Sequence, residues 1–160
     1  DLHIYTVKDD ETVEMKSDAN GAESLLSDVQ AGAGVNYVVF TGKDGKFYIY
    51  RTSGDSSITY RVCAYTVDGT TLKQEGMLEN EYGPSEDNTN EISDEYSRNG
   101  KKITVKLGKK LFHESFQNLD KAILFSGYDE TSIWSCFDTD SALSVSSDDM
   151  IAQLEKGMDD

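Results

Sequence analysis

The sequence predicts an α+β fold in which an antiparallel β-sheet, built as a meander of hairpins, predominates over two short helices. Asp-Gly or Asn-Gly dipeptides occur at 44–45, 68–69 and 99–100. They are the strongest short-range hairpin signal, because type I′ turns need positive φ at both central residues. The segments around them are rich in tyrosine and β-branched residues, which favour strands. From 160 residues and 17.7 kDa we expect a single domain over 1–160.

The first part of the chain reads as a hairpin followed by a helix. Residues 2–7 alternate apolar and polar side chains, 9–10 form a turn, and 12–16 return as a second strand. Apolar side chains then recur at helical spacing near 21–31, with glycines directly after them. This pattern predicts the first of the two short helices.

The middle of the chain has the clearest strand pattern. Strands are expected at 35–41, 47–51, 58–67 and 70–74, separated by turn residues. In the longest of them, alternate residues face opposite sides of the sheet. One face is predicted to carry Ile58, Tyr60, Val62 and Ala64, and the other Thr59, Arg61, Cys63 and Tyr65.

Residues 79–97 stand apart because of their charge. The stretch 79–95 contains seven acidic residues and no Lys or Arg, and Gly83-Pro84 interrupts any regular element. A run of like charges with a proline is typical of exposed, irregular chain. We therefore expect an acidic loop at 79–97.

The last third combines strands with a terminal helix. Residues 103–107 alternate apolar and polar side chains, which predicts a half-buried strand with a basic outer face. The apolar residues between 111 and 119 fit either one or two helical turns or a covering loop. Further strands are expected at 122–125 and 133–137.

The second short helix is predicted at 147–156. Ser146 or Ser147 is its expected N-cap, because a serine hydroxyl can accept from a free backbone N–H of the first turn. Asp148 and Asp149 follow directly, where negative charge suits the helix dipole.

The charge of the chain restricts its partners. A net charge of −15 and a pI near 4.4 mean that the protein repels phosphate backbones and anionic lipid. This argues against nucleic-acid binding, and no apolar run is long enough to span a bilayer. One stretch, 98–121, has seven basic residues against two acidic ones. Either the acidic ends of the chain cover this stretch, or it faces an acidic partner.

No motif for catalysis or cofactor binding is present. The nucleophile pattern G-x-S-x-G, the zinc patterns HExxH and CxxC, and a glycine-rich phosphate loop are missing. No spacing selects His3 or His113 as a general base. We therefore predict no cofactor. Glu86, Asp87 and Glu91 are candidate ligands for a weakly held calcium ion, with a solvated run of charges as the alternative.

Tyrosines supply the candidate binding surface. Tyr48, Tyr50 and Tyr65 are placed in an outward-facing row that could stack on sugar rings or grip a protein partner. The alternative, which we favour, is that such tyrosines pack across strands and stabilise the sheet. The cysteines Cys63 and Cys136 either form a disulfide that closes a long loop or remain separate thiols.

One stretch carries a resemblance to known proteins. The segment FTGKDGKFYIYRTSGDSSITYRVCAYTVDGTTLKQ and the helix SSDDMIAQLEKG resemble uncharacterised exported proteins and lipoproteins of Gram-positive gut bacteria. The resemblance implies an extracytoplasmic location and transfers no catalytic residue. Because the chain starts at Asp1, with neither a leader nor a lipobox cysteine, we expect either that a leader has been removed or that the chain is a segment of a longer protein.

Together these features predict an extracellular or cell-surface domain that binds a protein or carbohydrate partner without catalysis. Two alternatives stay open. The thirty acidic side chains include enough carboxylates for a hydrolase, for example one acting on glycans. The second alternative is a structural spacer in a surface protein, which predicts no sizeable concavity.

Overall fold

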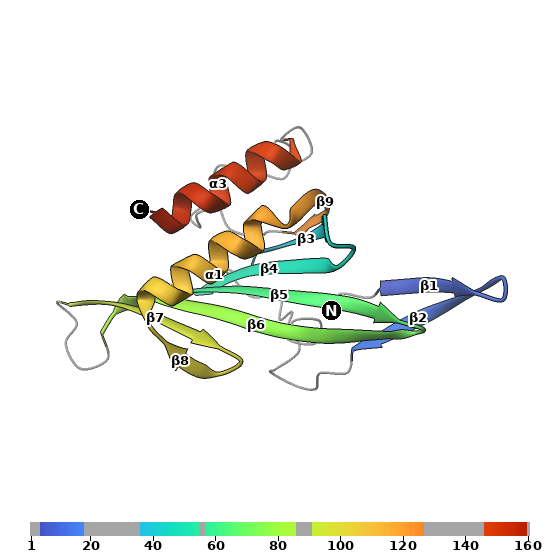
Figure 1. The fold of residues 1–160 in the computed structure, drawn as a ribbon, viewed down its shortest axis with the longest axis horizontal. Coiled ribbons are helices and arrows are strands. Elements are labelled where there is room, and N and C mark those ends of the chain that lie inside the picture. The colour runs from blue at the N-terminus through green and yellow to red at the C-terminus, as the bar shows by residue number, and fades with distance from the viewer. Residues whose placement is uncertain (1–3, 18–35, 55–56, 86–90, 127–145, 160) are drawn as a thin grey trace.

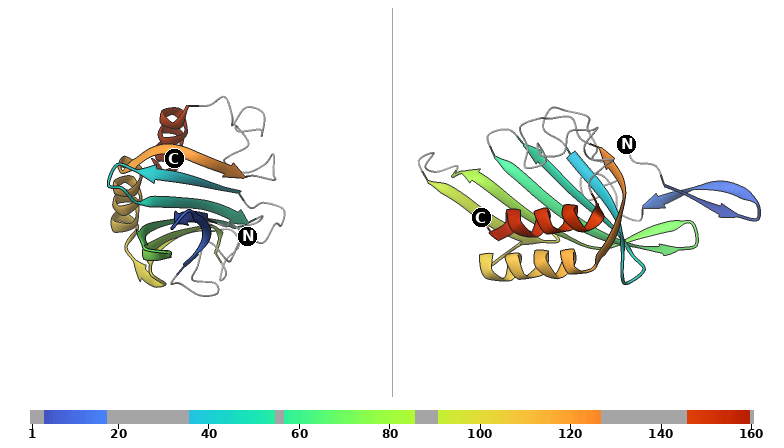
Figure 2. Two further views of the ribbon diagram at one scale, coloured as in Figure 1. Left: turned by 90° about the vertical axis from the view of Figure 1, so that its right-hand side faces the viewer. Right: turned by 90° about the horizontal axis from the view of Figure 1, so that it is seen from above.

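The computed structural model describes residues 4–17, 36–54, 57–85, 91–126 and 146–159. In these residues, nine strands form one sheet, and two helices lie side by side on one of its faces (Figures 1 and 2). We call this side of the sheet the helix face and the opposite side the back face. The prediction of a mainly antiparallel sheet in an α+β fold is confirmed.

The strands are β1 (Ile4–Lys8), β2 (Glu11–Ser17), β3 (Asn36–Gly42), β4 (Phe47–Gly54), β5 (Ile58–Asp68), β6 (Thr71–Pro84), β7 (Ile92–Arg98), β8 (Lys101–Ile103) and β9 (Leu119–Ser126). The helices are α1 (Val105–Gln117) and α3 (Ser147–Asp159). The main strand order is β1-β2-β6-β5-β4-β3-β9, and β7 joins β6 to β8. Every pairing is antiparallel except the short parallel contact of β2 with β6.

The glycine of each expected turn dipeptide has a left-handed backbone, although the turns differ. Asn99 and Gly100 both have positive φ, at 51° and 71°, as a type I′ turn requires. In the β5–β6 turn, Gly69 alone has positive φ, at 61°. The β1–β2 turn uses Asp9 and Asp10, at 51° and 64°, since Asp tolerates this region better than most residues.

The prediction of a strand at 103–107 is wrong, because β8 ends at Ile103 and α1 begins at Val105. The Thr104 hydroxyl accepts a hydrogen bond from the backbone N–H of Leu107, which caps the helix. Gly108, Phe112 and Phe116 form the buried face. Their spacing of four residues is helical, and it outweighs the short alternation before it.

The loop predicted at 79–97 is also wrong over most of its length. Strand β6 continues to Pro84 and β7 begins at Ile92, so these acidic residues form a hairpin whose strands pair from Leu78 with Arg98 to Pro84 with Ile92. Only 86–90 lies outside the described residues. Pairing with β5 and β7 satisfies most of the backbone of β6, and the alternation of the strands lets most of the described carboxylates reach solvent.

Helix α3 confirms the second predicted helix and shows which serine caps it. The Ser146 hydroxyl accepts from the backbone N–H of Asp149 at 3.1 Å. The Ser147 hydroxyl instead accepts from the backbone N–H of Ala122 in β9 at 3.0 Å, which ties α3 to the sheet. The helix predicted near 21–31 and the strand predicted at 133–137 lie outside the described residues.

Apolar side chains are buried on both faces of the sheet. On the helix face, Phe112 and Phe116 of α1 pack against the tyrosines of β4 and β7; the ring centroids of Tyr50 and Phe116 are 5.8 Å apart. The back face has its own cluster, made of Val39, Ile49, Cys63, Tyr65 and Leu72. The predicted division of β5 into two faces is confirmed, because Tyr60 and Val62 belong to the first cluster and Cys63 and Tyr65 to the second.

Candidate functional site

A groove of about 270 Å³ lies between the sheet and the C-terminal half of α1. Its floor is apolar, with Val62, Ala64 and Leu78 from the sheet and Leu111 from the helix. Charged side chains of both signs stand around this floor; they are Lys46, Glu75, Arg98 and Glu114. Ligand sites usually combine apolar side chains with a few fixed polar groups, and polar groups provide much of the lining of this groove.

A β-bulge brings Glu75 to this groove. Ala64 of β5 pairs with Gly76, but the next residue, Tyr65, pairs with Gln74, so Glu75 is the extra residue of β6. Gly76 has a φ of 154°, which glycine adopts without strain. Bulges redirect side chains, and this one lets Glu75 reach past β5 to the β3–β4 turn.

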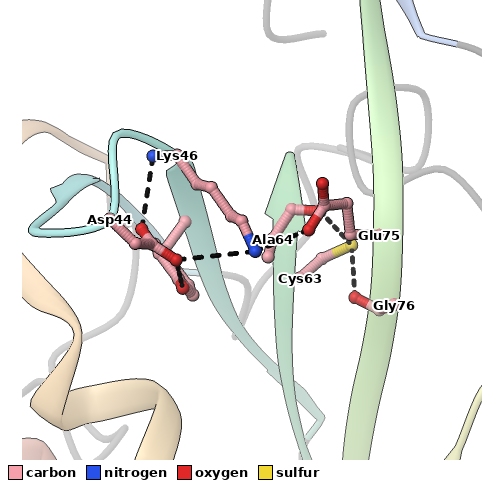
Figure 3. A network of polar contacts seen from close by, with 7 residues as sticks. Asp44, Lys46, Cys63, Ala64, Glu75 and Gly76 are labelled. Carbon is pink, nitrogen blue, oxygen red and sulfur yellow. Dashed lines mark hydrogen bonds and ion pairs between the residues drawn. The ribbon is translucent and has the colours of Figure 1, made fainter. Parts of the chain in front are cut away.

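Ion pairs and hydrogen bonds form a network at the end of the groove where Lys46 and Glu75 lie. Figure 3 shows this network. The Lys46 ammonium lies 2.6 Å from a Glu75 oxygen and 3.5 Å from Asp44 Oδ2. The Tyr48 hydroxyl donates to the same Asp44 oxygen at 2.8 Å. On the other side of the bulge, the Cys63 thiol lies 3.0 Å from the carbonyl oxygen of Gly76 and donates to it. The bulge is therefore held from two sides.

The electrostatics of the network keep each group in one protonation state. The hydrogen bond between Lys46 and Glu75 raises the pKa of Lys46 and lowers the pKa of Glu75. Burial pushes the pKa of Asp44 upward, but the hydrogen bonds from Tyr48 and Lys46 outweigh it, so the net shift is downward. Burial, followed by the bond to Asp44, raises the pKa of Tyr48 to about 12. None of these shifts moves a pKa toward neutral pH, where a general acid or base works best.

The other end of the groove is more open. Arg98 is exposed in β7, and no ion pair within the described ranges involves it. On the helix wall, Glu114 lies 3.6 Å from Lys110, an exposed pair of the kind that contributes little. A guanidinium such as that of Arg98 can bind a carboxylate through two parallel hydrogen bonds.

The wall that α1 contributes is anchored by the β3–β4 turn. The backbone N–H of Lys43 donates to the Asn118 carbonyl at 2.7 Å, and its ammonium donates to the Gln117 carbonyl at 2.9 Å. A cation at the C-terminus of a helix also suits the helix dipole. The turn therefore holds the helix end in place beside the groove.

The tyrosines predicted as an outward row do not form one. Tyr48, Tyr50 and Tyr65 are 5%, 1% and 1% exposed. Tyr48 and Tyr50 belong to the cluster on the helix face, whereas Tyr65 lies in the cluster on the back face. The register explains the separation, since Tyr48 pairs with Ala64, and Tyr65 pairs with Phe47. Only Tyr48 reaches the groove, as part of its lining.

The remaining candidate residues are only partly placed. Glu91 is exposed, while Glu86 and Asp87 lie outside the described residues, so the calcium site stays a prediction. Across the described ranges, no group of three or more His, Cys, Asp or Glu side chains is arranged to hold a metal ion. Cys63 is buried, and Cys136 lies outside the described residues, so their pairing also stays a prediction.

A second hollow of about 250 Å³ lies on the β6–β7 hairpin. It is lined by serines and by two carboxylates, Glu81 and Glu95, which are directly opposite each other across the strands. The hydrogen bond from Lys102 lowers the pKa of Glu95. A carboxylate hydrolase needs an acid with a raised pKa, whereas the pKa of Glu95 is shifted downward.

Sequence reasoning missed the groove because its charged residues come from four separate elements: the β3–β4 turn, β6, β7 and α1. One signal was available. A glycine inside a strand pattern suggests a bulge, and Gly76 directly follows Glu75. The partners across the groove depend on tertiary packing.

Comparison with known proteins gives no match: no family model, no curated protein and no solved structure matches the chain. Within the described residues, neither helix has the length and apolar character needed to cross a membrane.

Proposed function

We propose that this chain is a non-enzymatic binding domain, at the cell surface or outside the cell, whose ligand occupies the groove between α1 and the sheet. One observation carries the proposal: the groove combines apolar side chains with charges of both signs, and Arg98 in its lining is exposed. The charge state of the network does not change near neutral pH, which suits recognition rather than proton transfer.

The lining favours a ligand with a carboxylate and an apolar group, such as the end of a peptide. A volume of about 270 Å³ suits a group the size of an amino acid. A carbohydrate would need an exposed aromatic ring to stack on. Tyr48, the one aromatic side chain in the lining, is buried, and its hydroxyl is bound to Asp44. A protein or peptide partner therefore fits better than a glycan.

The alternatives draw less support from the structure. A spacer domain predicts no sizeable concavity, whereas the groove has both a volume and a charged rim. A carboxylate hydrolase needs an acid with a raised pKa. Among the described carboxyl groups, those with a shifted pKa are Asp44, Asp68, Glu75 and Glu95, and each is shifted downward.

The test uses a matched pair of small probes. N-acetyl-leucine carries a carboxylate and N-acetyl-leucinamide does not, so their difference reports the contribution of Arg98. We expect the acid to shift amide resonances around the groove and the amide to bind roughly tenfold more weakly. Arg98→Gln should remove that difference, while Lys101→Gln, on the same hairpin but outside the groove, should keep it.

Equal binding of both probes, or shifts that are unchanged in Arg98→Gln, would contradict the carboxylate assignment. A chitin oligosaccharide serves as the carbohydrate probe. If it shifts the groove resonances and N-acetyl-leucine does not, the ligand is a glycan instead.

A further inference from the structure

Strand β7 has an outer edge that is only partly covered. It begins at Ile92, and β6 pairs with it along its whole length. On the other side, β8 pairs only with Tyr96, Ser97 and Arg98. Over 92–95, therefore, no strand in the described part of the chain occupies the outer edge. Such an edge is a template for pairing with another extended chain.

The open backbone groups can be identified from the hydrogen bonds to β6. The backbone N–H of Ser85 donates to the carbonyl of Glu91 at 2.8 Å, so the main chain of Glu91 faces β6. In an antiparallel strand, the polar groups of successive residues point alternately to the two sides. Ser93 therefore also faces β6, and the N–H and C=O groups of Ile92 and Asp94 point outward.

Apolar side chains lie beside this edge on the helix face. Ile92 is 67% exposed and Tyr82 is 44% exposed. Ile92 pairs with Pro84, and Tyr82 pairs with Asp94, so Ile92 and Tyr82 are diagonal neighbours on one face. Tyrosine is one of the residues enriched in binding hot spots. An added strand would place every second side chain over them.

Carboxylates line the same edge on the back face. Glu91 and Glu95 are exposed there, and Glu81 is the cross-strand partner of Glu95. Lys102 pairs with Glu95 at 2.7 Å, but the hairpin from 79 to 95 contains no basic residue of its own. Two copies of this edge would bring like charges together, which disfavours self-pairing. A basic segment would be attracted instead, and the net charge of −15 would speed its approach.

We propose that the outer edge of β7 at Ile92–Asp94 is a docking edge for an extended basic segment of a partner protein. The segment adds as a strand antiparallel to β7, in line with β8. Every second residue of the segment is apolar and covers Ile92 and Tyr82 on the helix face. The residues between them are Lys or Arg, which pair with the carboxylates of the back face. This surface is separate from the groove.

The test uses a synthetic hexapeptide of alternating Lys and Val, acetylated and amidated at its ends. In the antiparallel arrangement, the residue opposite Ile92 has its side chain on the helix face, so the valine amides face β7. Methylating the valine nitrogens should weaken binding at least about tenfold, because it removes the hydrogen bonds. Methylating the backbone nitrogens of the lysines adds the same mass and changes no charge. Because these nitrogens face away from β7, this change should leave binding nearly unchanged. Amide exchange at Ile92 and Asp94 should slow when the peptide binds.

Protein variants separate charge from backbone pairing. Glu91→Lys should weaken binding, whereas Glu11→Lys, an equal charge change at the β1–β2 turn, should have a much smaller effect. Tyr82→Ser should weaken binding without altering the circular dichroism of the fold. Equal affinity of the two methylated peptides would overturn the proposal. A dimer of the protein alone that protects the amides of Ile92 and Asp94 would overturn the assigned occupant and make it a second copy.

Discussion

Gly108 of α1 lies directly against the ring of Tyr96 in β7. A Cβ atom added to Gly108 would stand 2.2 Å from Tyr96 Cγ and Cδ1, closer than real Cβ contacts come. The helix can therefore approach the sheet at this point only because residue 108 has no side chain. This contact sets the N-terminal half of α1 on the sheet, while the β3–β4 turn holds its C-terminal end.

Gly108→Ala should destabilise the protein. Alanine improves helix propensity by about 1 kcal/mol, but overpacking of a filled interface costs about 1–3 kcal/mol. We expect a net loss in the free energy of unfolding, measured by urea denaturation. In the background of Tyr96→Leu, which frees space under the helix, Gly108→Ala should be less harmful. Equal losses in both backgrounds would contradict the close contact.

The two serines before α3 should have separable effects. Ser146→Ala removes the N-cap bond to Asp149 and should cost about 1 kcal/mol. Ser146→Asp supplies another capping oxygen and should restore most of this loss. Ser147→Ala instead deprives the Ala122 N–H of its acceptor, again at about 1 kcal/mol. Faster amide exchange at Ala122 in Ser147→Ala alone would identify its role; the same change in Ser146→Ala would contradict it.

Acid should weaken the fold in part through the Lys46 network. The pKa values of Glu75 and Asp44 lie below their ordinary values of 4.5 and 3.8. Their stabilising contribution is therefore complete above those ordinary values and is lost as the pH falls through the lower folded-state values. Glu75→Gln should lose less stability than the parent protein across this acid range. Melting temperatures of both proteins from neutral pH down to acid measure this, with Glu11→Gln as the control. Parallel curves for all three would refute it.

Alkali should also weaken the fold, in this case through ionisation of the buried tyrosines. Burial raises the pKa of Tyr48 to about 12 from an ordinary value of 10.0. Burial also raises the pKa values of Tyr50, Tyr60 and Tyr96. A raised pKa means that stability is complete below pH 10 and is lost as the pH rises through the folded-state value. Tyr48→Phe should flatten the loss between pH 10 and 12.

The ultraviolet absorbance of tyrosinate, followed together with circular dichroism, measures this effect. Part of the tyrosinate signal should appear only when the fold is lost. The exposed Tyr82→Phe serves as the control, and it should leave the delayed part of the signal in place. Complete ionisation of the native protein near pH 10 would contradict the burial of these rings.

Local sequence determined the hairpins from β1 to β6 and the last helix, but not the β6–β7 hairpin. Turn dipeptides such as Asn99-Gly100 and the alternation in β5 act over a few residues, so they predict strands, turns and the two faces of β5 without knowledge of the rest. The serine before α3 belongs to the same class, since capping is a contact within one helical turn.

Tertiary structure alone decided which residues meet. The register between β4 and β5 placed Tyr48 and Tyr65 on opposite faces, and burial of both faces removed the expected tyrosine row. Helix α1 replaced an expected strand because Gly108, Phe112 and Phe116 had a sheet to pack against. The groove and the open edge of β7 arise from contacts between residues far apart in the chain. Such contacts depend on how strands align and helices pack, which periodicity within one segment does not specify.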